Sequence, residues 1–79
     1  KVDKVIELTK NEMIIFMCLF DNLGKIVSRD EIMTTLWNND EYVNDNALTV
    51  NISRLRSKLS DASLNDAIET KKGLGYILL

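Results

Sequence analysis

The sequence predicts an α+β domain in which a core of three helices is followed by a C-terminal β-hairpin. Three stretches place apolar residues at the spacing of an amphipathic helix, and each follows a Thr, Ser, Asn or Asp that suits an N-cap. Near the C-terminus, two alternating apolar segments surround a glycine-containing turn. The chain has 79 residues, so we expect residues 1–79 to form one domain.

The first helix is expected at about residues 10–22. The weakly alternating segment 1–8 before it predicts a short strand, the remnant of a longer sheet region. Thr9 and Glu12 have the spacing of a capping box, in which each side chain bonds the backbone amide of the other residue. Apolar side chains surround so much of this helix that we expect burial on most sides. A left-handed Gly24 is suited to end it.

The second helix is expected at about residues 29–37. Ser28 opens it with another capping-box pattern, and the short apolar segment 25–27 predicts a strand-like connector. Residues 38–45 are acidic and rich in Asn, and they lack any periodicity, so they predict a loop.

The third helix is expected at residues 46–59, with Asn44 or Asp45 as its cap. A polar connection leads from it to residues 67–78, where apolar residues alternate on both sides of Lys-Lys-Gly-Leu-Gly. Gly73 and Gly75 supply turn conformations that are closed to other residues. These features predict the hairpin.

Composition limits the classes of function. The chain is 46% hydrophobic and 28% charged, as in folded globular domains, and its longest apolar run has eight residues, too few for the ~18 of a membrane span. It starts at Lys1 without a Met and shows no signal-peptide pattern, so we interpret it as a fragment of a longer protein. We expect no membrane partner.

The chain has one cysteine, Cys18, and no histidine. A cysteine inside an apolar run is expected to be reduced and buried, and the lack of any possible internal disulfide fits the cytoplasm. Nucleophiles activated by His are excluded, and a structural zinc site lacks ligands. We therefore expect no cofactor, no metal and no enzymatic activity; Asp30 and Glu31 suit the positive end of a helix dipole.

Charge is distributed unevenly. Residues 1–45 carry five Lys or Arg and nine Asp or Glu, whereas residues 46–79 carry five and three. No acid lies between Asn46 and Ser60. Because salt screens charges over ~8 Å, this local balance matters more for binding than the net charge of −2.

The third helix has two distinct faces. At about 100° per residue, the apolar side chains Leu48, Ile52, Leu55 and Leu59 share one side. The opposite side and its flanks carry small or polar residues, one valine and cations. They are Asn46, Ala47, Thr49, Val50, Asn51, Ser53, Arg54, Arg56 and Lys58.

Such a face meets the requirements of a DNA major groove. Small side chains allow close approach, Arg and Asn can bond to guanine and adenine, and a valine can touch a thymine methyl. Cations on the flanks would meet phosphates. For an isolated helix, a solvated cationic face explains the same residues, so this alternative stays open.

The hairpin favours the groove interpretation. Its tip carries Lys71 and Lys72 beside glycines, where they can reach an adjacent minor groove or its phosphates. Together these elements describe a winged helix-turn-helix, with a three-helix core, a C-terminal hairpin wing and a short N-terminal strand remnant.

Three segments, SRDEIMTTLW, LTVNISRLRSKL and IETKKGLGY, resemble the winged-helix effector domain of OmpR/PhoB-type response regulators. The resemblance covers about residues 8–78. It implies a transcription factor that binds double-stranded DNA, with recognition helix 46–59 in the major groove and wing 67–78 at the adjacent minor groove. It also implies a receiver domain, absent from this chain, that a sensor histidine kinase phosphorylates to promote homodimers on tandem half-sites.

The resemblance implies roles for single residues. Arg54 matches an arginine that reaches bases and backbone, and Arg56 matches one that contacts phosphate. Val50 matches a residue that touches thymine methyls. Lys72 stands where the family usually has a wing arginine aimed at the minor groove, and Thr70 matches a wing threonine near phosphate.

Two further features have more than one interpretation. Trp37 matches an indole that can donate to phosphate, while core packing is an equal alternative, and both can hold at once. Loop 38–45 matches a segment that some members use to contact RNA polymerase, and a solvated loop explains it equally well. The third helix also resembles the branch that responds to cell-envelope antibiotics.

Four positions depart from the family pattern. The family usually has Arg-Thr or a similar pair where this chain has Asn46 and Ala47, His in place of Asn51, and Arg in place of Ser53. The groove face is therefore less basic than usual, which implies a different half-site preference.

Besides DNA binding, two functions remain open from the sequence. The overall acidity fits a winged helix that binds protein and not DNA. An enzyme would have to work with carboxylates or lysine alone, and nothing in the sequence demands one. DNA binding is the leading expectation.

Overall fold

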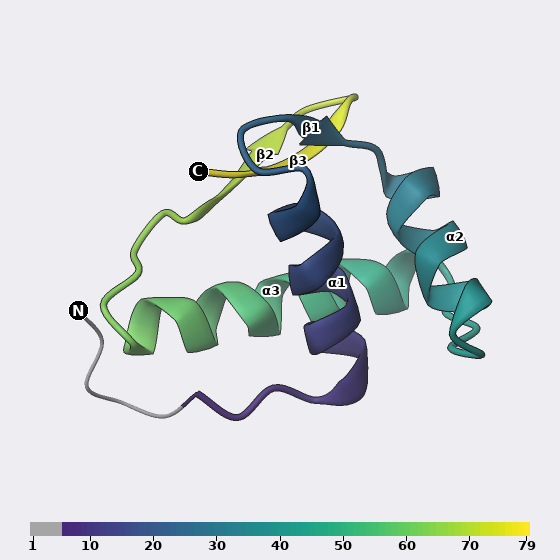
Figure 1. Cartoon of the computed structure of the whole chain (residues 1–79), viewed down its shortest axis with the longest axis horizontal. Coiled ribbons are helices and arrows are strands. Elements are labelled where there is room, and N and C mark those ends of the chain that lie inside the picture. The colour runs from purple at the N-terminus through teal and green to yellow at the C-terminus, as the bar shows by residue number, and fades with distance from the viewer. Residues whose placement is uncertain (1–5) are drawn as a thin grey trace.

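The computed structural model describes residues 6–79. Figure 1 shows α3 along one side of the molecule, α1 crossing it, α2 near the N-terminal end of α3, and a small sheet above them. The elements are α1 (Lys10–Asp21), β1 (Ile26–Val27), α2 (Arg29–Asn38), α3 (Asp45–Asp61), β2 (Ile68–Lys71) and β3 (Gly75–Leu78).

The N-terminus of α1 has the predicted capping box. Thr9 Oγ1 accepts from the Glu12 amide at 3.2 Å, and the Thr9 amide donates to Glu12 Oε1 at 2.9 Å. The helix ends within one residue of its predicted end, and Gly24 follows with φ +79°, the left-handed conformation expected of it.

Side chains also cap the other two helices. Ser28 Oγ accepts from the Glu31 amide at 3.1 Å, and the Glu31 carboxylate accepts from the Ser28 hydroxyl at 3.4 Å. Asn44, one of two predicted candidates, caps α3 by accepting from the Ala47 amide at 2.8 Å. Helix α3 therefore begins one residue earlier than predicted and ends two residues later.

The sheet has three antiparallel strands in the order β1-β3-β2. Its two C-terminal strands are the predicted hairpin, and the predicted connector 25–27 contributes the edge strand β1. Tyr76 in the central strand lies opposite Val27 on one side and Thr70 on the other. This pairing ties the wing to the residues directly before α2.

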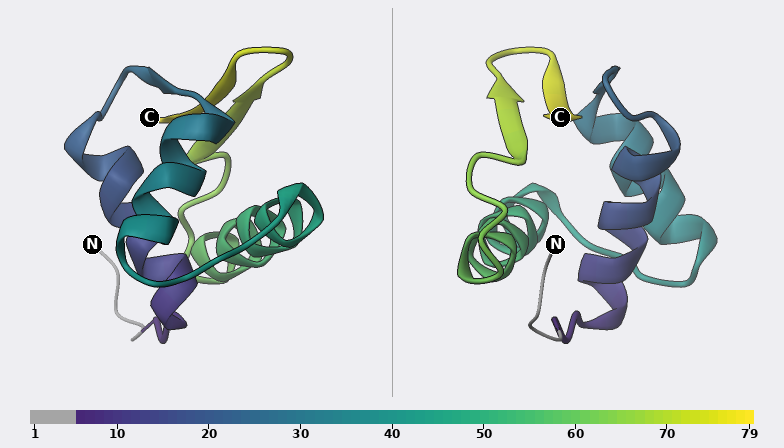
Figure 2. Two further views of the ribbon diagram at one scale, coloured as in Figure 1. Left: turned by 90° about the vertical axis from the view of Figure 1, so that its right-hand side faces the viewer. Right: turned by 60° about the vertical axis from the view of Figure 1, so that its left-hand side comes forward.

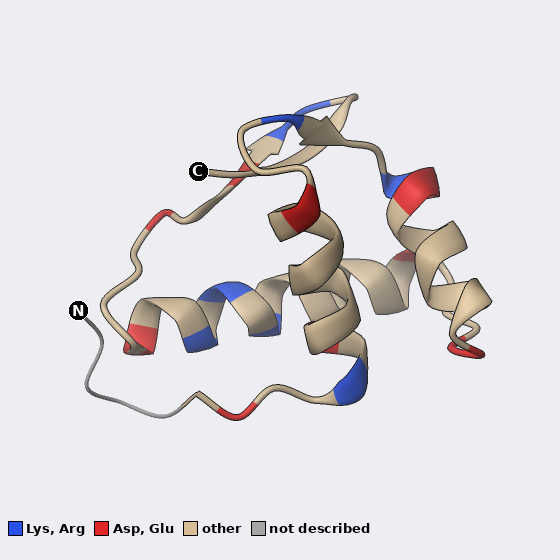
Figure 3. Ribbon diagram, in the orientation of Figure 1, with Lys and Arg blue, Asp and Glu red and all other residues tan. Residues whose placement is uncertain are grey.

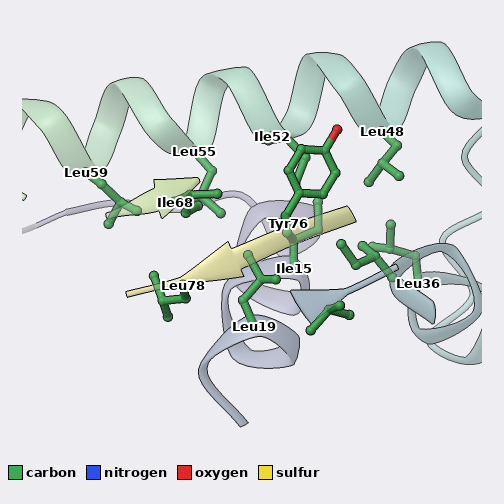
Figure 4. Packing of buried hydrophobic residues seen from close by; sticks show 12 residues of the cluster. Ile15, Leu19, Leu36, Leu48, Ile52, Leu55, Leu59, Ile68, Tyr76 and Leu78 are labelled. Atoms are coloured by element: carbon green, nitrogen blue, oxygen red, sulfur yellow. The ribbon is translucent and has the colours of Figure 1, made fainter. Parts of the chain in front are cut away.

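The core lies between α3, α1 and the inner face of the sheet. The predicted apolar face of α3 is confirmed, because all four of its side chains are at most 3% exposed. Figure 4 shows them pointing toward the sheet, with Ile15 and Leu19 of α1 nearby. The predicted face is formed by Leu48, Ile52, Leu55 and Leu59.

The prediction that α1 is buried on most sides is wrong. Ile15 and Leu19 are fully buried, but Met13, Met17 and Phe20 remain 46%, 43% and 52% exposed. The reason is that α1 packs against α2, α3 and β3 with one side only. Within residues 6–79, no element covers the other side.

The predicted strand at residues 1–8 lies largely outside the described residues, and residues 6–9 form no strand. For the described part of the chain, no helix is both long enough and apolar enough to span a bilayer.

Candidate nucleic-acid interface

The outward face of α3 presents most of its predicted residues to solvent. Asn46, Val50, Ser53 and Arg54 are all exposed, and Val50 keeps 46% of its surface. An exposed valine on the side opposite the core is available to a binding partner. This matches the surface that the sequence predicts for a groove-binding helix.

Two polar residues of the predicted face are engaged within the protein. The Asn51 amide donates to the Ala47 carbonyl at 2.8 Å, so this side chain folds back on its own helix. Thr49 Oγ1 accepts from Arg29 at 3.1 Å. Ala47 and Asn51 are half-buried, whereas Thr49 is exposed. Thr49 and Asn51 therefore offer less free hydrogen-bonding capacity than Asn46 and Arg54.

Arg56 connects α3 with the wing. Its guanidinium donates to Thr70 Oγ1, and its Nε is buried without a hydrogen-bond partner among the described residues. The two residues predicted to contact phosphate thus lie side by side, one on the helix and one on β2. One DNA backbone passing this point would meet both.

The structure places Lys58 away from this surface. Its Nζ lies 2.5 Å from Glu12 Oε1 in α1, and Glu12 is only 1% exposed. Burial raises the pKa of the Glu12 carboxyl, but the bonds from Lys58 and Thr9 outweigh it, so the pKa lies below its ordinary value. The ammonium of Lys58 thus neutralises an interior carboxylate between α3 and α1.

The wing carries its cations near the turn. Lys71 Nζ lies 3.0 Å from Glu69 Oε1, a solvent-exposed pair that contributes little to stability. Lys72 is exposed at the turn. Leu74 follows it with 63% of its surface exposed, and sequence reasoning had not singled out this apolar tip.

Trp37 is 47% exposed, so it is not a core residue. Its indole N–H donates to the Val43 carbonyl at 3.3 Å across the loop. The loop acids are also engaged: Glu41 lies 3.2 Å from Lys10, and Asp40 accepts from the Tyr42 hydroxyl at 3.2 Å. The indole donor for which the family resemblance implies a phosphate contact therefore closes loop 38–45 in this structure.

Sequence reasoning missed the contacts of Arg29. Its Nη1 donates to Tyr76 Oη at 2.6 Å, and its Nη2 donates to the Asp45 carbonyl at 2.8 Å. Arg29 belongs to the motif that opens α2, but a sequence motif does not indicate which distant side chains its arginine meets. A groove between the start of α2 and the wing is lined by Arg29, Lys71 and Lys72, among others.

The predicted helix and wing lie on one side of the molecule. Both views in Figure 2 place α3 and the hairpin on the side away from α1. Figure 3 shows basic segments on α3, on the hairpin and at the start of α2. The structure thus brings together Asn46, Val50, Ser53 and Arg54 on α3 and, beside the Arg56–Thr70 contact, Lys71 and Lys72 on the wing, while Lys58 faces α1.

Comparison with known proteins gives the chain a family context. The family model "Transcriptional regulatory protein, C terminal" matches residues 3–78. The response regulator protein GraR of Staphylococcus aureus (strain Mu50) is 54% identical over 77 residues, which are 98% of this chain and 34% of GraR. The chain therefore spans about a third of the length of the curated relatives it matches.

Solved structures share the fold. The C-terminal domain of the nisin resistance regulator NsrR, a lantibiotic response regulator, has a TM-score of 0.88 and 36% identity, covering 96% of this chain and 77% of that one. The DNA-binding domain of the response regulator AdeR, solved in complex with an intercistronic region, has a TM-score of 0.82 and 27% identity, covering 95% and 74%.

Proposed function

The chain belongs to the family of C-terminal domains of transcriptional regulatory proteins, and from this premise we propose that it binds double-stranded DNA as the effector domain of a response regulator. One observation carries the proposal. The contact between Arg56 and Thr70 sets the wing beside α3, so that one duplex can meet both. The similar AdeR domain was solved with DNA, which supports the same use of the fold.

In this proposal α3 enters the major groove with its exposed face. Val50 contacts a thymine methyl, and Arg54 and Asn46 bond base edges. The small side chains of Ser53 and Ala47 let the helix approach closely. Since no acid lies between residues 46 and 60, nothing on this stretch repels the duplex.

The wing contacts the adjacent minor groove. Lys72 and Lys71 contact phosphates or the edge of the groove. Arg56 and Thr70 bind the DNA backbone between the two grooves. Thr49 and Asn51 position neighbouring groups through their internal hydrogen bonds. Trp37 supports the loop, and it contacts a phosphate only if its bond to Val43 opens.

The remaining proposals concern the longer protein. Its relatives are response regulators, so we propose a receiver domain, a cognate sensor histidine kinase, homodimers on tandem half-sites and a cytoplasmic, non-enzymatic regulator of transcription. Loop 38–45, with its 77% exposed Tyr42, is a candidate contact for RNA polymerase. The similarity to NsrR supports a response to antibiotics that act on the cell envelope.

A pair of substitutions tests the DNA interface. Binding sites are first selected from random duplex DNA, and affinities are then measured by gel shift over a range of salt concentrations. Arg54→Ala is expected to cost ~1–3 kcal/mol on the selected site and much less on unrelated DNA. Lys72→Ala is expected to weaken binding to all sequences and to reduce the salt slope by about 1.

Lys25→Ala is the matched control, because it removes the same charge from the segment between α1 and β1. It should leave the affinity for the selected site unchanged. Wild-type affinity in both Arg54→Ala and Lys72→Ala would disprove the proposed interface. A flat salt response with no enriched motif would favour a protein-binding winged helix.

A further inference from the structure

One guanidinium group, on α2, joins the two elements proposed to contact DNA, which are α3 and the wing. Arg29, the first residue of α2, donates through Nη2 to the Asp45 carbonyl at 2.8 Å and to Thr49 Oγ1 at 3.1 Å, both in the first turns of α3. Its Nη1 donates to Tyr76 Oη in β3 at 2.6 Å. The guanidinium carbon also lies 5.9 Å from the centre of the Tyr76 ring.

The partners of Arg29 are themselves held firmly. Tyr76 is 7% exposed, and Figure 4 shows its ring pointing from β3 toward α3, with the hydroxyl oxygen at the far end. Asp45 lies in the first turn of α3, directly after the Asn44 cap. Because a guanidinium is planar and its N–H groups diverge at fixed angles, it sets the direction between two such partners.

We propose that Arg29 is a positioning residue, which holds the wing at the correct place relative to the N-terminal half of α3. This inference rests on the proposed function. Helix and wing are two contacts to one ligand, and the second contact gains most from the first when their separation is fixed at the span of the two binding sites. When the hydrogen bond between Arg29 and Tyr76 is broken, α3 still enters the major groove, but the wing no longer holds Lys72 at the minor groove.

A direct contact between Arg29 and a phosphate is the competing explanation, because 33% of its side chain is exposed beside the basic groove. The two explanations differ in their dependence on Tyr76. Tyr76→Phe removes only a hydroxyl group and changes no charge. It therefore breaks the Arg29–Tyr76 bond without removing a cation from the surface.

The test is a set of double-mutant cycles on DNA selected by the unmodified chain. Lys72→Ala is measured alone and together with Tyr76→Phe or with Arg29→Lys, which keeps the charge but loses the fork. Tyr42→Phe is the matched control, since its hydroxyl bonds to Asp40 in the loop. Thermal unfolding of every variant shows whether the fold is retained.

We expect Lys72→Ala to lower affinity about tenfold in the unmodified chain and less than about twofold in the Tyr76→Phe and Arg29→Lys backgrounds. Arg54→Ala should lower affinity by the same factor in all backgrounds, because the major-groove helix stays docked. If a variant were only less stable, the contributions of Lys72 and Arg54 to affinity would fall by the same factor. The Tyr42→Phe control should leave the Lys72 effect unchanged.

Losses of affinity in Lys72→Ala and Tyr76→Phe that simply add in the double variant would overturn the inference. It would also be overturned if Tyr76→Phe left the affinity unchanged while one further variant, Arg29→Ala, reduced the salt slope by about 1. The latter result would mean that Arg29 contacts phosphate itself. If the unmodified chain selects no DNA sequence, the proposed function fails first and the inference falls with it.

Discussion

Of the single methyl groups that could be added to the wing, the one introduced by Gly75→Ala should destabilise it most. Gly75 opens β3 with φ +147°, a conformation that L-residues rarely adopt. A Cβ atom at this position would lie 2.1 Å from the Val27 carbonyl oxygen and 2.8 Å from Ser28 Cα. Both are backbone atoms, so no flexible side chain can move aside.

The structure indicates a large cost. Restoring a normal contact of ~3.5 Å requires β1 and β3 to separate by more than about 1 Å. Val27 is 1% exposed and pairs with Tyr76, so the shift would open the core as well as the sheet. The strained φ angle of an alanine costs ~1–3 kcal/mol, and overpacking against β1 costs a similar amount. Together they lower the free energy of unfolding of Gly75→Ala by about 4 kcal/mol.

Gly73→Ala is the internal comparison. Gly73 has φ +76°, and nothing lies within 4 Å of a Cβ atom built on it. This variant should lose only about 1 kcal/mol, the cost of a left-handed alanine. The difference between the two variants isolates the close approach of β3 to β1.

Urea unfolding followed by circular dichroism measures both variants. We expect Gly73→Ala to unfold cooperatively at a slightly lower urea concentration, and Gly75→Ala to lose most of its stability or show no cooperative transition. Losses within about 1 kcal/mol of each other would refute the close approach, since both glycines would then act only through φ.

The other predictions concern the helices. Lys58→Met leaves the buried Glu12 carboxylate without its cation, and because Lys58 is partly exposed we expect a loss of about 2 kcal/mol at pH 7. Because the pKa of Glu12 is lowered from its ordinary value of 4.5, the stability that the ion pair contributes is complete above that pH and is lost as the pH falls through the lowered pKa. Urea titrations should therefore show the difference between wild type and variant narrowing in acid. Asn44→Ala removes the bond to the Ala47 amide and should cost ~1 kcal/mol in thermal unfolding. Burial raises the pKa of Cys18, so iodoacetamide at pH 8 should modify it more slowly in the folded chain than in the urea-unfolded chain.

Local sequence signals were sufficient for the helices and the hairpin. Thr9, Ser28 and Asn44 accept hydrogen bonds from backbone amides at helix starts, and these bonds involve residues only three positions away. Gly24 and Gly73 adopt the positive φ angles that their positions require. Short-range chemistry of this kind can be identified in a sequence because all partners are adjacent in it.

Burial of α1 could not be predicted in the same way. Its sequence shows apolar residues on nearly every side, but exposure depends on which elements arrive, and α2, α3 and β3 pack on one side. Met13, Met17 and Phe20 therefore stay exposed in the described chain. Apolar periodicity identifies a helix, but it does not show how many of its sides are covered by other elements.

The candidate site was predicted in part for a related reason. The outward direction of Val50 and Arg54 follows from helix geometry alone. The ion pair of Lys58 joins residues 46 positions apart, and Arg29 meets a tyrosine 47 positions away. Pairings over such distances depend on the tertiary fold, so sequence reasoning did not foresee the ion pair of Lys58 with Glu12 and missed the contacts of Arg29.

The outward face of α3 and the wing are proposed to bind one duplex together. Nuclear magnetic resonance of the nitrogen-15-labelled chain, titrated with a selected duplex, tests this joint binding most directly. We expect the amide signals of residues 46–54 and 70–74 to shift together, with little change along the exposed side of α1. Shifts concentrated at Met13, Met17 and Phe20, with those two segments unchanged, would contradict it.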